Sequence, residues 1–345
     1  MKLLNVKLYV YSNSPHISAI LTGFLMLKKQ RKISLDIEKT AKPDTLPHEH
    51  IVFAEIDGMR IVFDEADGYL CKKDVDLSNY IGSVDFYFKR SFSAKKNIDL
   101  ISEGVRDRVY PLGFNYHVTY PNNPIDREIG RRHKIRNYFS NQCTEHYFLP
   151  HVFEGKANHI IRDPQIIFMA RLWNPEIETT FPVSELEYIN SMRIRIIREL
   201  REKYGKNFIG GVKKDSYSLK TCPDIVMDDK YTDRKAYIKT MKKADICIGS
   251  IGLHESIGWK TGEYVAAARA IVNERFRYEV PGGFEEGKNY LAFASAKECL
   301  KYVDLLYSNK DEIYNMKSAN EKYYREYLRP DKQVGNAIRI AMGID

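Results

Sequence analysis

Apolar, strand-like runs alternate with helical stretches along most of the chain, and this alternation constrains the fold more than any other feature. In the first half LNVKLYVYS precedes the helical ISAILTGFLMLKKQ, and in the second half PQIIFMARL precedes SELEYINSMRIRIIRELREKYG. Such alternation is typical of parallel sheets covered by helices. Because the pattern occurs twice and weakens between residues 119 and 161, we predict two α/β domains.

The length of 345 residues suits two cores of about 150 residues each. We place the first domain at residues 1–160 and the second at residues 161–328. The remaining residues are amphipathic, and Pro330 interrupts them because proline cannot continue a helix. We therefore expect a final helix at 329–345 that packs back on the first domain. The predicted fold class is α/β, with two doubly wound, Rossmann-like domains and a cleft between them.

One pair of strand-like runs in the first half departs from the alternation with helices. IVFAEI and RIVFDEA flank Asp57 and Gly58, and Asp-Gly between two apolar runs is a strong signal for a two-residue turn. We therefore expect an antiparallel hairpin within the first domain.

The net charge of +8 and the pI near 9.0 favour anionic partners such as phosphates, nucleic acid, acidic glycans or lipid headgroups, without choosing among them. The densest basic stretch, residues 127–136, carries isoleucines among its charges. It suits either peripheral contact with an anionic membrane surface or a solvated helix face.

Five widely spaced cysteines without a C-x-x-C pair indicate a reducing compartment. The segment MKLLNVKLYVYSNS is too short and too polar for a signal peptide or a membrane span, so we expect a cytoplasmic protein.

The most informative segment runs from Ile246 to Val272, where an apolar strand leads through a glycine-containing loop into a helix. Backbone N–H groups at a helix start are unsatisfied and point along the helix dipole, which favours a bound diphosphate. Gly258 and Gly262 allow a ligand to approach the main chain closely. We therefore predict a phosphate site at this helix start.

Two glutamates in the same segment, Glu255 and Glu263, lie eight positions apart. An ionised carboxylate accepts hydrogen bonds from the hydroxyl groups of a sugar or a ribose. Glu255 in the loop would face a sugar, and Glu263 inside the helix would face a ribose. Taken alone, such a pair also arises by chance on a protein surface.

The whole segment resembles the E-x7-E region of retaining GT-B glycosyltransferases, such as those of family 4, also described as glycosyl transferases group 1. The family pattern E-G-F-G followed by E-A-x-A is matched here by residues 255–258 and 263–266, in the same register. Ser256 replaces the usual first glycine, and Ala268 and Ala270 replace the familiar glycine and proline before the next strand. The resemblance covers roughly residues 162–330.

The resemblance also implies roles for residues outside the loop. Arg171, in FMARLWNP, occupies the position of an arginine that contacts the donor phosphates. The lysine that usually follows is absent, and Lys213 and Lys214 either replace it or belong to a solvated turn. His117 lies roughly where relatives carry a histidine near the donor sugar, although a packed or surface histidine is the alternative.

The function expected from this resemblance is transfer of a sugar, with retention of configuration, from a nucleoside diphosphate sugar to a hydroxyl of a glycan, lipid-linked or protein-linked acceptor. The family takes its acceptor in loops of the first domain, here residues 12–16 and 115–117. We expect no metal and no cofactor besides the donor substrate, and His48 and His50 lack a third ligand of suitable spacing. The catalytic candidates are Glu255, Arg171 and His117, and the donor-binding candidates are Glu263, Gly258, Lys213, Trp259, Lys260 and Thr261.

Two other classes of function remain open. The positive charge and the many tyrosines also suit a non-catalytic nucleic-acid-binding protein, which we consider the less favoured reading. The same donor site would also serve a GT-B relative that acts on sugar phosphates, such as an epimerase or a phosphorylase. The acidic run Phe63–Asp67 reads like a helicase box, but no Walker A loop accompanies it.

Overall fold

The computed structural model describes residues 3–125 and 148–344, so the basic stretch 127–136 lies outside the described residues. The chain divides into two compact units. Unit 1 comprises Met1–His151, Arg277–Gly283 and Arg325–Asp345, and unit 2 comprises Val152–Phe276 and Phe284–Tyr324. The chain therefore leaves unit 1 a few residues before the boundary expected at residue 160.

Unit 1 contains a six-stranded mixed sheet in the order β2-β1-β3-β4-β5-β6. Its strands are β1 (Leu4–Val10), β2 (Ile33–Lys39), β3 (Ile51–Ile56), β4 (Met59–Asp64), β5 (Phe86–Lys89) and β6 (Val109–Pro111). β3 runs antiparallel to β1 and β4, and the other neighbours pair in parallel. Asp57 and Gly58 join β3 to β4 with φ of 45° and 91°, which confirms the predicted hairpin.

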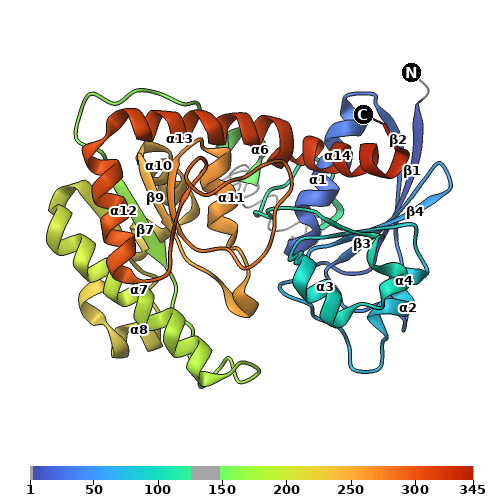
Figure 1. Cartoon of the computed structure of the whole chain (residues 1–345), viewed down its shortest axis with the longest axis horizontal. Coiled ribbons are helices and arrows are strands. Elements are labelled where there is room, and N and C mark those ends of the chain that lie inside the picture. The colour runs from blue at the N-terminus through green and yellow to red at the C-terminus, as the bar shows by residue number, and fades with distance from the viewer. Residues whose placement is uncertain (1–2, 126–147, 345) are drawn as a thin grey trace, which may run out of the picture. The chain divides into compact units, whose positions relative to one another are not determined.

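Helix α1 (Ser18–Lys29) of unit 1 packs against the C-terminal helix α14 (Pro330–Met342), as Figure 1 shows. The two helices approach closely at Gly23, where an added Cβ would lie 2.3 Å from the Pro330 carbonyl oxygen. Val334 and Ile338 of α14 join the apolar core formed by α1 and the sheet. The remaining helical segments of unit 1 are η1 (Pro15–Ile17), α2 (Leu77–Gly82), α3 (Ala94–Leu100) and α4 (Glu103–Arg106).

Unit 2 contains a parallel sheet in the order β11-β10-β9-β7-β8. Its strands are β7 (Ile166–Ala170), β8 (Phe208–Val212), β9 (Ile246–Gly249), β10 (Ala270–Glu274) and β11 (Leu291–Phe293). Val226 forms a parallel bridge with Val212 and so adds a minimal sixth strand beside β8. The resulting order is that of a Rossmann fold, and the strand order reverses between β7 and β9.

Helices cover both faces of this sheet. The crossover through α7 (Val183–Tyr204) runs toward β8, and the crossover through α11 (Trp259–Ala266) runs the other way, toward β10. Because such crossovers are right-handed, α7 and α11 lie on opposite faces. The other helical segments between residues 150 and 328 are α6 (Pro150–Phe153), η4 (Gly205–Asn207), α8 (Ser216–Thr221), η5 (Pro223–Ile225), α9 (Asp229–Thr232), α10 (Arg234–Lys243), η6 (Leu253–Glu255), α12 (Ala296–Ser308), α13 (Lys310–Tyr323) and η7 (Tyr324–Leu328).

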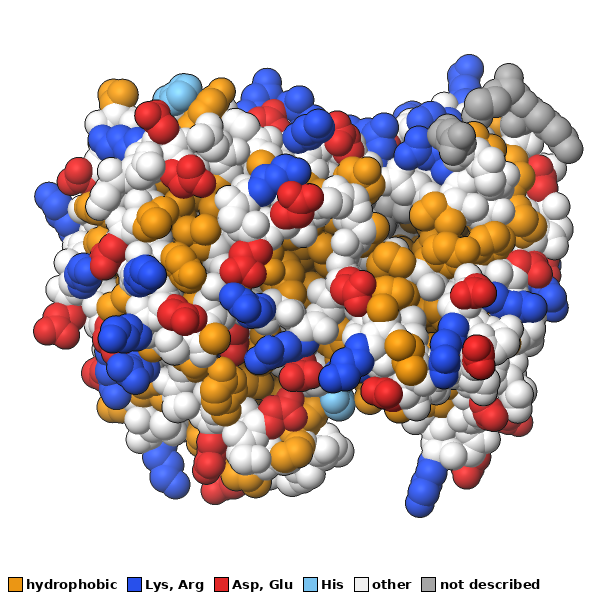
Figure 2. Space-filling model, in the orientation of Figure 1, with side chains coloured by type: hydrophobic (Ala, Val, Ile, Leu, Met, Phe, Trp, Pro, Cys, Tyr) orange, Lys and Arg blue, Asp and Glu red, His pale blue; other side chains and the backbone are white. Residues whose placement is uncertain are grey.

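The distribution of surface charge and the hydropathy of the helices both bear on the predicted partners. Figure 2 shows acidic and basic side chains interspersed on the visible faces of both units, so the net positive charge forms no continuous basic field there. Among residues 3–125 and 148–344, no helix is long and apolar enough to cross a membrane.

Candidate functional site

The carboxyl ends of β7 and β9 are neighbours at the point where the strand order of unit 2 reverses. Doubly wound sheets bind their ligands in the crevice outside the strands at such a point. The loop after β7 carries Arg171, and the loop after β9 carries Glu255. The structure thus places the loops that carry two of the predicted site residues after neighbouring strands.

A buried arginine on α7, Arg193, ties these two loops together. Its guanidinium donates to the Arg171 carbonyl oxygen at 2.7 Å, to Ser250 Oγ at 2.9 Å and to the Ile251 carbonyl oxygen at 2.9 Å. Burial lowers the pKa of Arg193 to about 10, so it remains charged at neutral pH. The sequence does not indicate this role for Arg193, because its position on an amphipathic helix carries no signal for a contact with two distant loops.

Lys260, in the first turn of α11, donates from Nζ to the Met169 carbonyl oxygen at 2.7 Å. Burial lowers the pKa of Lys260 to about 8. Repulsion from nearby arginines also lowers this pKa, whereas the carboxylate of Glu263 raises it. The arginines concerned are Arg193, Arg234 and Arg171. Repulsion between Lys260 and these three arginines indicates a place where an anion would be stabilised.

We define the cationic cluster as Arg171, Arg193, Arg234 and Lys260. Arg171 is its exposed member. Its guanidinium carbon lies 3.5 Å from the centroid of the Trp173 ring. Stacking on an aromatic ring holds the planar guanidinium in place and leaves its edge available for hydrogen bonds. Arg171 therefore occupies a position from which it can contact a ligand phosphate.

The loop that carries Glu255 has an unusual backbone. Ile251 and Ile257 form an antiparallel bridge, and Gly252 N donates to the Ser256 carbonyl oxygen at 2.8 Å. Between them, His254 and Glu255 both adopt positive φ, 55° and 58°. Each such residue costs on the order of 1 kcal/mol or more, and strain of this kind concentrates at ligand-binding and catalytic sites.

Glu263 has a different environment, because its carboxylate is buried between α10 and α11. Arg234 Nη1 lies 2.8 Å from Oε1, and the Tyr237 hydroxyl donates to Oε2 at 2.6 Å. Only 3% of Glu263 is exposed. The two glutamates that the sequence paired are thus distinct, one in a strained, partly exposed loop and one inside an ion pair.

Gly258 is the N-cap of α11, and Trp259, Lys260 and Thr261 form its first turn. Trp259 and Lys260 are partly exposed, whereas Thr261 is buried and its Oγ1 donates to Asn273 Oδ1 at 3.0 Å. The helix start that was predicted to hold phosphate is present, but the Thr261 side chain faces the sheet.

Lys213 and Lys214 follow β8 directly, and both side chains are exposed. The Lys213 backbone N–H donates to the Ala170 carbonyl oxygen at 2.8 Å, which holds this turn beside the end of β7. Lys213 is therefore placed at the same edge of the sheet as the cationic cluster.

In unit 1, His117 packs against Phe148, with ring centroids 4.3 Å apart. A larger group of polar residues lies at the carboxyl ends of β1, β4 and β5. At its centre, Asp64 Oδ2 accepts from Lys89 Nζ at 2.8 Å and from the Tyr87 hydroxyl at 2.6 Å, and His48 Nε2 lies 3.2 Å from Oδ1. Burial alone would raise the pKa of Asp64, but Lys89 and His48 hold it well below its usual range.

Beside this network, Glu65 is fully buried, and neither of its carboxylate oxygens accepts a hydrogen bond of normal geometry from the described residues. Burial raises the pKa of Glu65 well above its usual value. The rings of His16 and His50 lie 4.5 Å apart nearby, and burial lowers the pKa of His16 to about 4 and also lowers that of His50. Unit 1 therefore places a carboxyl group that resists ionisation next to two imidazoles that resist protonation.

Within residues 3–125 and 148–344, no group of three or more His, Cys, Asp or Glu side chains has an arrangement that could hold a metal ion. In the run Phe63–Asp67, whose sequence is similar to a helicase box, Asp64 and Glu65 instead belong to the buried polar group of unit 1. No local pattern in the sequence indicates this.

No protein-family model matches the chain, and neither does any curated protein. Solved structures that align with the chain include MnaA from S. aureus with UDP, at a TM-score of 0.43 and 11% identity over 100% of this chain and 98% of that one. The C-terminal domain of a glycosyl transferase group 1 family protein from Francisella tularensis gives 0.32 and 13%, over 51% of this chain and 95% of that one. The pneumococcal O-GlcNAc transferase GtfA, with UDP and GlcNAc, gives 0.36 and 9% over 93% and 54%. At these TM-scores the similarities assign the chain neither a family nor an activity.

Proposed function

We propose that the chain is a GT-B glycosyltransferase that moves a sugar from a nucleoside diphosphate sugar to an acceptor hydroxyl. The observation that carries the proposal is the cationic cluster at the strand-order reversal of unit 2, directly beside the strained loop of Glu255. As the glycosidic bond stretches, negative charge builds up on the leaving diphosphate. Fixed cations at that place stabilise the charge and lower the barrier.

Each residue of the site has a proposed role. Arg171 contacts the diphosphate from its stacked position, and Lys213 and Lys260 add positive charge that would otherwise come from a metal ion. Gly258 and Trp259, at the start of α11, would lie against the donor phosphates. Glu255 orients the transferred sugar. We include His117 among the catalytic residues on the earlier resemblance alone.

Glu263 retains a proposed role at the ribose despite its burial. Arg234 and Tyr237 each occupy one carboxylate oxygen. A carboxylate offers about four lone-pair sites, so two remain for ribose hydroxyls. Under this proposal Arg234 and Tyr237 fix the orientation of the carboxylate before the donor binds.

We further propose that transfer retains the configuration of the sugar. The proposed acceptor is a glycan or a lipid-linked saccharide in polysaccharide biosynthesis. We place the enzyme in the cytoplasm, with peripheral membrane contact through residues 127–136.

A thermal-shift screen against nucleoside diphosphates and their sugars tests the donor site, because a ligand that binds only the folded state raises the melting temperature. Arg171→Ala and Glu255→Ala should each lower transfer by at least about tenfold, roughly 1.4 kcal/mol of barrier. Arg195→Ala provides the control, because Arg195 is an exposed arginine on α7 that pairs with Glu199. A protein that no nucleotide stabilises, or full activity in both site variants, would contradict the proposal.

A second candidate is an enzyme that rearranges a nucleotide sugar or sugar phosphate without an acceptor, such as an epimerase. The raised pKa of Glu65 and the lowered pKa values of the paired rings of His16 and His50 favour it, because a group that keeps its proton beside groups that accept one suits proton transfer. Analysis of the products formed from a labelled donor, with and without an acceptor, separates transfer, epimerisation and hydrolysis.

Salt-sensitive binding of DNA or RNA by a protein whose melting temperature no nucleotide raises would instead support the nucleic-acid-binding alternative.

A further inference from the structure

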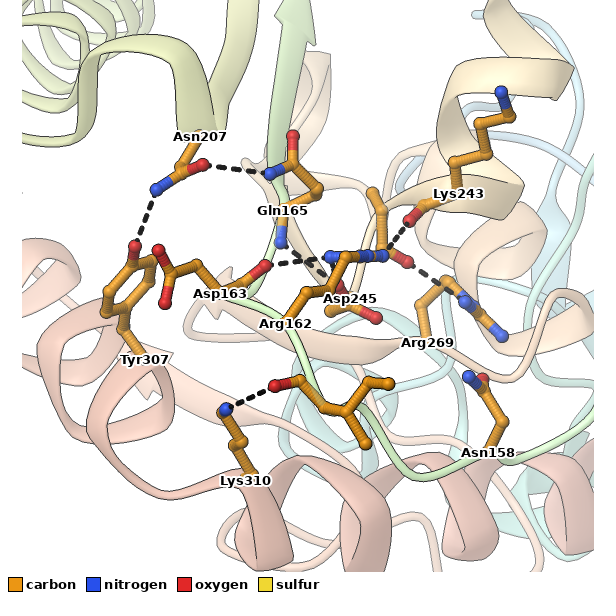
Figure 3. Close-up of polar contacts among 12 residues, drawn as sticks. Asn158, Arg162, Asp163, Gln165, Asn207, Lys243, Asp245, Arg269, Tyr307 and Lys310 are labelled. Carbon is orange, nitrogen blue, oxygen red and sulfur yellow. Dashed lines mark hydrogen bonds and ion pairs between the residues drawn. The ribbon is translucent and has the colours of Figure 1, made fainter.

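A hollow lies at the opposite edge of the unit 2 sheet, around the amino ends of β7, β8 and β9. Figure 3 shows polar contacts among its lining residues. Its volume is about 800 Å³, within the range of small-molecule sites in proteins. The strand starts Gln165, Ile166 and Ile209 contribute to its lining, together with the last turn of α10. We call this hollow the amino-edge cavity. It belongs to unit 2 alone and shares no lining residue with the cationic cluster.

Positive charge dominates the lining of the amino-edge cavity. Five basic side chains line it, against one carboxylate, that of Asp245. Asp245 is already neutralised, because Oδ1 lies 2.8 Å from Lys317 Nζ and Oδ2 lies 2.7 Å from Arg162 Nη1. The basic residues are Arg162, Lys239, Lys242, Lys243 and Arg269.

Two of these cations are fixed in the wall of the cavity. Lys242 Nζ donates to the carbonyl oxygens of Val152 and Glu154, at 3.0 and 2.7 Å. Arg269 donates to four main-chain carbonyl oxygens, including that of Ala244 at 2.9 Å. Carbonyl oxygens satisfy the donors but do not cancel the charges. Burial lowers the pKa of both side chains, and repulsion from neighbouring cations lowers it further.

Two more cations are exposed at the mouth. Lys239 and Lys243 lie one turn apart on α10, and neither has an ion pair or a side-chain hydrogen bond within the described part of the chain. In Figure 3 the Lys243 side chain extends away from its own carbonyl group, which accepts from Arg162 Nη2 at 3.2 Å. These two lysines are therefore available to a ligand.

Ile209 of β8 adds an exposed apolar side chain to the amino-edge cavity. It is 37% exposed, whereas Ile166 and Ile167 of β7, which also line the cavity, are buried. An exposed isoleucine beside several cations favours a ligand with an apolar portion next to its negative charge. A simple inorganic anion would leave this surface in water.

We infer that the amino-edge cavity is a second ligand site, which binds a molecule carrying a phosphate group attached to an apolar or aromatic portion. The phosphate pairs with Lys239 and Lys243 near Arg162, and the apolar portion covers Ile209. A free phosphorylated metabolite and an anionic phospholipid headgroup share this chemistry. The inference does not depend on the proposed transfer reaction.

Phenyl phosphate is the soluble probe, and its affinity is measured by calorimetry in an Arg171→Ala background, which weakens binding at the carboxyl edge. We expect phenyl phosphate to bind more tightly than inorganic phosphate. The double variant Lys239→Ala/Lys243→Ala should weaken its binding at least about tenfold, because two charge-assisted contacts are lost. Lys297→Ala/Lys301→Ala is the matched control, because these exposed lysines have the same spacing on α12.

The second arm of the experiment uses sedimentation with vesicles of phosphatidylcholine, with and without phosphatidylglycerol. Binding to the anionic vesicles by the control variant, but not by Lys239→Ala/Lys243→Ala, identifies a lipid headgroup as the ligand. Binding of phenyl phosphate without vesicle binding identifies a free metabolite. If neither probe binds, or if the double variant binds both as well as the control does, the inference is wrong. Because these readouts need no donor and no turnover, their outcome is separate from that of the proposed function.

Discussion

The carboxyl ends of the strands carry buried acids and imidazoles in unit 1, but arginines and a lysine in unit 2. In unit 1, Asp64 and Lys89 neutralise each other, and burial raises the pKa of Glu65. In unit 2, three arginines lie close enough to lower the pKa of Lys260, and Glu263 is the carboxylate that opposes them there. The same edge of two related sheets is thus suited to holding protons in one unit and an anion in the other. Fold alone does not determine such chemistry.

A single strand explains part of this difference. β3 runs antiparallel to its neighbours, so its amino end lies at the edge where β1 and β4 end. The residues that lead into β3 include His48 and His50, which therefore reach Asp64 and His16. In the parallel sheet of unit 2, a segment leading into a strand lies at the opposite edge, where the amino-edge cavity is found.

The largest effect should come from breaking the charge pair of unit 1. In Lys89→Met, Asp64 loses the positive charge of Lys89 in surroundings where each residue of the pair is only 1% exposed. We expect the free energy of unfolding to fall by about 3–5 kcal/mol, measured by urea titration. Asp64→Asn/Lys89→Met should recover part of the loss. Lys7→Met removes an exposed lysine that pairs with Glu38 and should leave the urea midpoint unchanged. An equally small change in Lys89→Met would show that the buried pair does not hold unit 1 together.

In unit 2, the corresponding test is Arg193→Met. This change keeps much of the side-chain volume but removes the three hydrogen bonds that join the loops after β7 and β9. We expect a loss of about 2–4 kcal/mol in stability, because carbonyl groups lose a charged donor. Nucleoside diphosphate affinity, followed by calorimetry, should also fall about tenfold. Arg195→Met on the same helix serves as the control. Unchanged affinity of Arg193→Met for nucleoside diphosphates would show that the cationic cluster does not take part in donor binding.

A smaller effect is expected for Tyr237→Phe, which removes the hydroxyl that donates to Glu263. The loss of this buried bond should lower stability by about 1–2 kcal/mol. If Glu263 holds the ribose, nucleotide affinity should fall severalfold as well, since its carboxylate is no longer fixed. Tyr231→Phe, at an exposed position on α9, is the control. Reduced stability with unchanged affinity would show that Glu263 has a structural role only.

Local features of the fold could be predicted from the sequence, whereas contacts between distant elements could not. The hairpin at Asp57–Gly58 and the strand, loop and helix around Glu255 were predicted, because turn chemistry and apolar periodicity are local properties. The ion pair of Glu263 with Arg234 was not, because it depends on how α10 packs against α11. For the same reason the sequence did not show the role of Arg193.

The pH dependence of stability is the most sensitive test of Glu65. The pKa of a glutamate is about 4.5 in the unfolded chain and is raised in unit 1, so between these values the folded protein holds a proton that the unfolded chain releases. Stability contributed by this group therefore falls as pH rises through that window, by up to about 1.4 kcal/mol per pH unit. Glu65→Gln stays neutral and should remove this fall.

Urea titrations of Glu65→Gln and the wild type should therefore diverge with rising pH, and the variant should gain relative stability. The comparison begins near pH 4.5, where the unfolded chain starts to release the proton. His16, whose pKa is lowered from 6.5 to about 4, adds a slope of its own below pH 6.5, but it does so in both proteins and cancels in their difference. Glu49→Gln removes an exposed carboxyl near the same histidines and controls for the change in net charge. A constant difference between Glu65→Gln and the wild type would mean that Glu65 is ionised in the folded protein. The carboxyl edge of unit 1 would then hold a buried negative charge rather than a proton. The two carboxyl edges would then differ only in the sign of their charge, negative in unit 1 and positive in unit 2.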